Sequence, residues 1–241
     1  MLGGFMKRLI VLSAIAMFIS ANVWATPAQV VIIRHAEKLA SGGEVNQQGC
    51  ERAYLLPKFF LNNSTVEQFG TPVATYAVEP NTAYSAIRAI QTIAPTAQAL
   101  SLQILDPATR IDYSRIVEQI MSNPAYDGKT VLMAWEHKAI PGLAQAFGAT
   151  LADYMMKWPG RVFDEAWVIN FVGANAPSVQ IIPEGVLPSD NPEGGKNWKN
   201  PPMATNDNSG IPQQVINECV NNSALNQIVA QITNPPLTPT P

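Results

Sequence analysis

Two histidines are present in this chain of 241 residues, and each closely follows a short apolar stretch. His35 comes after residues 30–33 with Arg34 in between, and His137 comes one residue after the stretch 131–135. A histidine ring nitrogen can attack an electrophile or carry a proton near neutral pH, and arginine binds anionic oxygens through its planar fork. The two residue types together indicate chemistry on an anionic group, with phosphate as the candidate.

A second arginine, Arg88, lies in the otherwise uncharged segment 85–92. Isoleucine and alanine recur there at helical spacing, and no acidic residue stands three or four positions away to form an ion pair along the helix. Such a guanidinium is either exposed to solvent or buried in order to bind an anion. Because its fork matches phosphate oxygens in a bidentate manner, we interpret Arg88 as a phosphate ligand.

Apolar stretches rich in β-branched residues alternate along the chain with segments of helical periodicity. The predicted strands are 30–33, 72–78, 102–105, 131–135 and 166–172, and the predicted helices are 47–61, one from 81 or 82 towards 100, 113–121 and 139–154, with a further helical patch at 213–232. Pro57 is expected to kink or shorten the first helix and Pro95 to break the second. The alternation predicts an α/β fold with a mostly parallel sheet covered by helices on both faces.

Both histidines follow the carboxyl ends of predicted strands, which is the edge where ligands bind in open α/β sheets. His35 and His137 are therefore expected to face each other across one crevice. A single histidine at a strand end often does no more than bond a loop carbonyl. Two histidines in equivalent positions, with Arg34 beside the first, favour a shared site.

Three blocks of the sequence resemble the histidine phosphatase superfamily, which has the phosphoglycerate-mutase-like fold. They are Arg34-His35-Ala36-Glu37-Lys38 followed by Asn46, Gly49 and Ala53; Ser85-x-x-Arg88-Ala89-x-Gln91-Thr92; and Trp135-Glu136-His137. The resemblance spans residues 30–148 and implies a three-layer α/β/α domain, which we place at 26–233. It also implies that His35 is the nucleophile, that Arg34, Arg88 and His137 form the phosphate pocket, and that no metal or cofactor is used.

The chemistry needs the same residue types. A neutral imidazole can attack phosphorus and leave again, which divides hydrolysis into phosphorylation and dephosphorylation of the enzyme. Fixed donors must meet the charge on the equatorial oxygens, and two arginines with a second histidine supply them. One nitrogen of His35 must stay unprotonated while an acceptor such as a carbonyl holds the other.

The sequence does not single out one general acid, because three carboxylates qualify by position. Asp106, which follows the stretch 102–105, is the first candidate; Asp112 and Glu136 are the alternatives. One branch of the superfamily has an aspartate directly after the second histidine, but Lys138 occupies that place here. The sequence therefore favours the other branch, in which a glutamate follows the third strand.

Composition excludes several other classes of function. The net charge is −3 and no stretch is rich in lysine and arginine, which argues against nucleic-acid binding because phosphate neutralisation needs clustered cations. The cysteines lack C-x-x-C spacing, and two histidines alone cannot complete a zinc site. We expect a small-molecule phosphate ester or a phosphorylated substrate as the partner.

Residues 1–25 have the pattern of a secretory signal peptide: Lys7 and Arg8, then an apolar stretch too short to span a bilayer, then small residues before Thr26. The mature protein is therefore expected to be secreted or periplasmic and not attached to a membrane. In an oxidising compartment Cys50 and Cys219 can pair, although two separate buried thiols remain the alternative. Residues 234–241 are predicted to form a flexible, proline-rich tail.

These observations lead to one principal functional hypothesis and two alternatives. The principal hypothesis is an exported phosphatase that hydrolyses a phosphomonoester through a phosphohistidine on His35. A catalytically silent module of the same fold that binds a phosphate ligand is the main alternative. A mutase is the third and is disfavoured, because the loops expected for sugar phosphates are not recognisable in the sequence.

Overall fold

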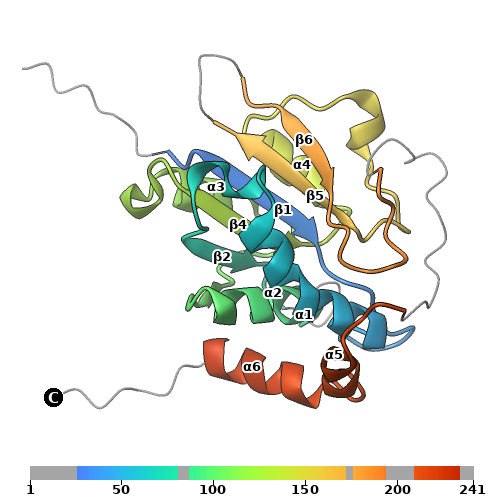
Figure 1. The fold of residues 1–241 in the computed structure, drawn as a ribbon. Coiled ribbons are helices and arrows are strands. Elements are labelled where there is room, and N and C mark those ends of the chain that lie inside the picture. The colour runs from blue at the N-terminus through green and yellow to red at the C-terminus, as the bar shows by residue number, and fades with distance from the viewer. Residues whose placement is uncertain (1–25, 81–86, 172–175, 194–208, 234–241) are drawn as a thin grey trace, which may run out of the picture.

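The computed structural model describes residues 26–80, 87–171, 176–193 and 209–233 (Figure 1). The predicted signal peptide, the predicted tail 234–241 and Ser85 of the second sequence block lie outside the described residues. Among the residues that are described, no helix combines the length and the apolar character needed to cross a membrane.

A six-stranded sheet with the order β3-β2-β4-β1-β5-β6 forms the centre of the fold. Its strands are β1 Gln29–Arg34, β2 Ala74–Ala77, β3 Ile104–Leu105, β4 Thr130–Trp135, β5 Glu165–Asn170 and β6 Val179–Pro183. β1, β2, β3 and β4 run parallel, while β5 pairs antiparallel with both β1 and β6. The predicted α/β fold with a mostly parallel sheet is confirmed, but sequence periodicity missed β6.

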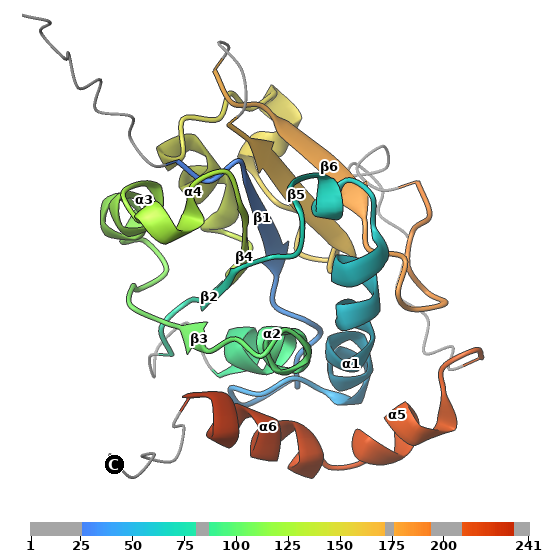
Figure 2. The same ribbon diagram turned by 60° about the vertical axis from the view of Figure 1, so that its left-hand side comes forward.

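Helices cover both faces of the sheet, which gives the predicted three-layer α/β/α arrangement (Figure 2). α1 Gln47–Asn62 and α2 Arg88–Ala99 pack together on one face, and α3 Tyr113–Met121 and α4 Ile140–Ala146 lie on the other. α5 Gln213–Glu218 and α6 Ser223–Thr233 follow near the C-terminus, and α6 packs on the outer side of α2.

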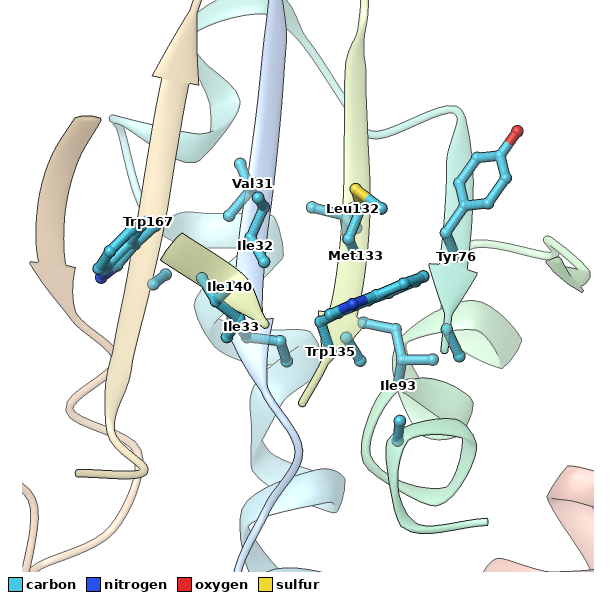
Figure 3. Close-up of a cluster of buried hydrophobic side chains, with 14 of the residues drawn as sticks. Val31, Ile32, Ile33, Tyr76, Ile93, Leu132, Met133, Trp135, Ile140 and Trp167 are labelled. Carbon is cyan, nitrogen blue, oxygen red and sulfur yellow. The ribbon is translucent and has the colours of Figure 1, made fainter. Parts of the chain in front are cut away.

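The two central strands are buried along their whole length, as their uninterrupted apolar sequences predict. In register, Ile33 pairs with Ala134 and Arg34 with Trp135. Figure 3 shows the side chains of these strands packed with Ile93 of α2, Ile140 of α4 and Trp167 of β5. This packing on both faces fixes where β1 and β4 end, and both functional loops begin there.

Four helix predictions need correction. α1 runs from Gln47 to Asn62 through Pro57, so this proline does not shorten it. α2 continues through Pro95 because residues 89–97 are all buried, so tertiary packing outweighs the hydrogen bond that proline cannot make. The helix predicted over 139–154 ends at Ala146. Gly148 adopts a φ of +85°, and the amide of Ala149 donates to the carbonyl of Ala144 at 3.0 Å, which is a Schellman termination.

The patch at 213–232 is two helices rather than one. Asn222 separates them with a φ of +55°, and its buried side chain donates to the carbonyl of Val45 at 2.8 Å. A disulfide joins Cys219, at the end of α5, to Cys50 in α1. Of the two alternatives for the cysteines, the structure shows the pair.

Candidate active site

His35 and His137 lie at the same edge of the sheet, directly after the parallel neighbours β1 and β4. The amide of His35 donates to the carbonyl of Trp135 at 3.0 Å, which extends the strand pairing into the loop. The two imidazole rings meet edge to face with centroids 6.4 Å apart. The structure therefore brings both histidines together as the strand pattern predicts.

The imidazole of His35 is held in one tautomer by its own loop. Its Nδ1 lies 2.8 Å from the carbonyl oxygen of Ala36. Because a carbonyl can only accept a hydrogen bond, Nδ1 carries the proton and Nε2 keeps its lone pair. Burial, together with the positive charge of Arg34, lowers the pKa of His35 to about 3, so the ring is neutral at ordinary pH.

The first turn of α2 is bonded to the same loop. The amide of Ala36 donates to the hydroxyl of Thr92 at 2.8 Å, and that hydroxyl donates to the carbonyl of Arg88 at 2.6 Å. Arg88 is the first residue of α2. This chain of two hydrogen bonds fixes the start of α2, and with it the arginine, relative to His35.

Arg34 is almost completely buried on the other side of the loop. One nitrogen, Nη1, donates to the carbonyls of Gly160 and Val162 at 3.0 and 2.7 Å, and the guanidinium lies 3.6 Å over the ring centre of Phe163. Burial lowers the pKa of Arg34 to about 9 despite the opposing effect of Glu37. Within the described part of the chain its buried Nε has no hydrogen-bond partner.

The positive charges of the site act on one another. Both Arg34 and Arg88 lower the pKa of His35, and Arg88 also lowers the pKa of Arg34. Burial lowers the pKa of Arg88 as well, while Glu136 opposes this effect. Two guanidinium groups that act in this way on a neutral imidazole are suited to bind an anion.

Glu136 supplies a carboxylate that acts on both arginines. Its Oε1 lies 3.0 Å from Nδ1 of His137, and its Oε2 lies 3.5 Å from Nη1 of Arg110. Burial alone would raise the pKa of Glu136, but His137 and Arg110 together lower it to about 2. Glu136 is therefore ionised and is suited to orient the second histidine.

The other two acid candidates have no contact with either histidine among those that the described residues show. Asp106 is exposed and follows β3, the edge strand of the sheet, which β2 and β4 separate from β1 by three strand spacings, about 14 Å. Asp112 lies 3.8 Å from Arg115 at the start of α3. The role of Asp106 as general acid stays a prediction, and Glu136 is the candidate that the structure places against His137.

The sequence analysis did not identify the residues that contact Arg34 from a distant part of the chain. Phe163, Gly160 and Val162 contact Arg34 from the segment before β5, and nothing in their local sequence indicates this. Within the described residues, no group of three or more histidine, cysteine, aspartate or glutamate side chains is arranged to hold a metal ion.

Comparison with known proteins finds no matching family model and no matching curated protein. Solved structures do match. The mycobacterial glucosyl-3-phosphoglycerate phosphatase is 11% identical, with a TM-score of 0.45 over 65% of this chain and 97% of that chain. The protein histidine phosphatase SixA, solved with tungstate, is 15% identical, with a TM-score of 0.44 over 65% of this chain and 97% of that chain.

A phosphoglycerate mutase from Plasmodium falciparum is 13% identical, with a TM-score of 0.42 over 66% of this chain and 90% of that chain. Similarities at TM-scores below 0.5 transfer neither a family nor a residue role to this chain.

Proposed function

We propose that the protein is a phosphatase that hydrolyses a phosphomonoester through a phosphohistidine on His35. The observation that carries this proposal is the state of that imidazole: Nδ1 is bonded to the carbonyl of Ala36, the pKa is about 3, and Nε2 is left unprotonated beside two arginines that lower this pKa. A neutral, oriented imidazole beside cationic groups is the arrangement that attack on phosphorus requires.

The arginines serve the same step. Charge spreads over the three equatorial oxygens of the transferred phosphoryl group, and donors that are already in position stabilise it without reorganisation. Arg34 and Arg88 supply two guanidinium groups, and His137 supplies a further ring nitrogen next to His35. A phosphomonoester dianion would also relieve the repulsion among these groups.

Protonation of the leaving group is assigned to the His137–Glu136 pair. Glu136 is ionised and cannot itself give up a proton at ordinary pH, but it lies 3.0 Å from Nδ1 of His137. In this assignment His137 gives the proton to the leaving group, and the carboxylate of Glu136 lies against its ring. Asp106 remains the alternative from sequence, and a test with two leaving groups separates them.

The proposal is tested by trapping the intermediate. The wild-type protein is incubated with a ³²P-labelled phosphomonoester and quenched in alkali, in which phosphohistidine survives. Label is expected on the wild type and not on His35→Ala, and turnover in that variant is expected to be abolished while the circular dichroism spectrum is unchanged. Phosphate binding without label or turnover in the wild type would identify the silent binding module instead, and full activity in His35→Ala would refute the nucleophile.

We also propose that the protein is exported. The charged and apolar pattern of residues 1–25 supports this, and so does the disulfide between Cys50 and Cys219, because such bonds persist in oxidising compartments. Mass spectrometry of the secreted or periplasmic product is expected to find Thr26 at the N-terminus. An intact chain in the cytoplasm would refute export.

A further inference from the structure

A second buried group of charges lies directly behind the loop that carries His35. Its centre is Arg52 of α1, and three carboxylates contact it: Glu37, Glu184 and Asp190. We propose that Arg52 is a positioning residue that fixes the orientation of the His35 imidazole through the carboxylate of Glu37. This inference deepens the proposed function and rests on it for the catalytic effect.

All the donors of the Arg52 guanidinium face carboxylate oxygens. Nε lies 3.0 and 3.2 Å from the two oxygens of Glu37, and Nη2 lies 2.7 Å from Oε1 of the same residue. Nη1 lies 2.9 Å from Glu184, and Asp190 receives Nη1 and Nη2 at 3.0 and 2.7 Å. Each of the five N–H groups of this rigid fork therefore has an acceptor. Both oxygens of Glu37 are held along the edge formed by Nε and Nη2.

The backbone of Glu37 is held as firmly as its side chain. Its carbonyl accepts the amide of Asn46 at 3.0 Å, and the side chain of Asn46 accepts the amide of Gly49 at 2.9 Å, capping α1. A Cβ at Gly49 would collide with the carbonyl oxygen of Glu37. The first turn of α1 therefore presses against the loop, and the Arg52 fork prevents the loop from moving away.

The link to His35 is covalent and short. The carbonyl that accepts the proton of His35 Nδ1 belongs to Ala36, in the peptide unit that joins Ala36 to Glu37. Rotation of Glu37 would turn this carbonyl away and release the imidazole from its tautomer. Fixing Glu37 therefore also fixes the peptide plane whose carbonyl is bonded to Nδ1 of His35.

The three carboxylates are not equivalent. Burial lowers the pKa of Arg52, but Glu37, Asp190 and Glu184 more than compensate, so the guanidinium stays charged. Burial raises the pKa of Glu184 well above its usual value, with Asp190 and Asp164 adding to the effect, and Oε1 of Glu184 is buried with no hydrogen-bond partner in the described part of the chain. They also differ in position: Glu37 belongs to the loop that carries His35, whereas Glu184 and Asp190 contact Arg52 from the segment after β6.

This difference provides matched controls for a test of positioning. Glu37→Gln removes the charge that holds the loop. Asp190→Asn and Glu184→Gln each change a carboxylate that contacts the same arginine, but from the segment after β6. All three change one carboxylate of one cluster, so a general weakening of the cluster would affect activity in each.

We expect Glu37→Gln to lower kcat by about ten- to a hundredfold with little change in KM, because a small displacement of a nucleophile has effects of this size. Asp190→Asn is expected to lower the melting temperature at least as much but to change kcat by less than about threefold, and Glu184→Gln to change neither. Equal losses of kcat in Glu37→Gln and Asp190→Asn would overturn the proposal.

The second measurement does not depend on turnover. The ¹⁵N signals of the His35 ring report its tautomer, and we expect them to change in Glu37→Gln and in Arg52→Lys, which keeps the charge but loses the fork, and to be unchanged in Asp190→Asn. If Glu37→Gln does not fold, Arg52→Lys decides. Unchanged His35 signals in the folded variant would overturn the proposal. If the wild type forms no phosphohistidine but these signals respond as expected, the proposed function fails and the positioning role stands.

Discussion

Two buried groups of charge meet at the loop after β1, and they differ in how completely their atoms are bonded. Around Arg52, every guanidinium N–H faces a carboxylate oxygen. In the pocket, Arg34 and Arg88 lie near a neutral His35, and Nε of Arg34 has no partner among the described residues. The donors of Arg52 are all used, which stabilises one conformation, whereas the mutually repelling cations beside His35 favour the binding of an anion.

The largest expected effect is on the free energy of unfolding and concerns the carboxylates around Arg52. Arg52→Met removes the cation and leaves Glu37 and Asp190 buried without compensation, so the free energy of unfolding should fall by about 3–5 kcal/mol. Urea denaturation with the disulfide intact measures it. Saturating inorganic phosphate should stabilise the wild type and the variant equally, so the difference between them should remain, because the ligand binds in the other group. A loss below about 1 kcal/mol would show that solvent or a shifted pKa neutralises these carboxylates.

In the pocket the expected change concerns catalysis and not stability. Arg88→Lys keeps the charge but loses the planar fork, so transition-state stabilisation should fall by about 2–4 kcal/mol, as for the removal of one oxyanion donor. The measurement is kcat/KM for a phosphomonoester, with the melting temperature as the control. If kcat/KM is unchanged, Arg88 is not a phosphate ligand.

Of the two groups, only the one around His35 and His137 could be predicted from the sequence. The uninterrupted apolar stretches predicted β1 and β4, and strand ends at one sheet edge predicted that His35 and His137 meet. The cluster could not be predicted, because Arg52 is separated from Glu184 by 132 residues and no local pattern distinguishes it from an exposed helix residue. The continuation of α2 through Pro95 also depends on tertiary packing, which propensity does not describe.

The pH dependence of stability sharpens the comparison, because His35 is buried in its neutral form. Its pKa is about 3 in the folded protein and 6.5 for an unperturbed histidine, so below pH 6.5 the unfolded chain binds the proton more readily. Stability should therefore fall as the pH decreases from 6.5 towards 3, and between about pH 7 and pH 5 His35 alone should contribute a loss of about 2 kcal/mol.

His35→Gln is the control for this prediction, since it retains every other titrating group. Urea denaturation at about pH 7 and pH 5 should show a smaller loss for the variant than for the wild type. Parallel losses in the two proteins would mean that His35 takes up its proton without cost, and that the pocket is not cationic.

The smallest expected effect concerns the leaving group. An alkoxide needs a proton in order to leave, whereas a nitrophenolate barely does. Glu136→Gln should therefore slow hydrolysis of an alkyl phosphate about tenfold more than that of a nitrophenyl phosphate. If the His137–Glu136 pair is the acid, Asp106→Asn and Asp112→Asn should slow neither substrate. If Asp106→Asn alone shows the dependence, the acid is the one that the sequence favours and not the His137–Glu136 pair.

The disulfide has a consequence for the covalent topology of the chain. Cys50 and Cys219 are 169 positions apart, so the bond closes a ring that contains most of the sheet. One peptide bond cut within this ring opens it but releases no fragment, whereas a cut outside the ring separates the chain into two pieces. A protease that nicks a loop between the two cysteines would thus leave a single molecule until a reductant separates its halves.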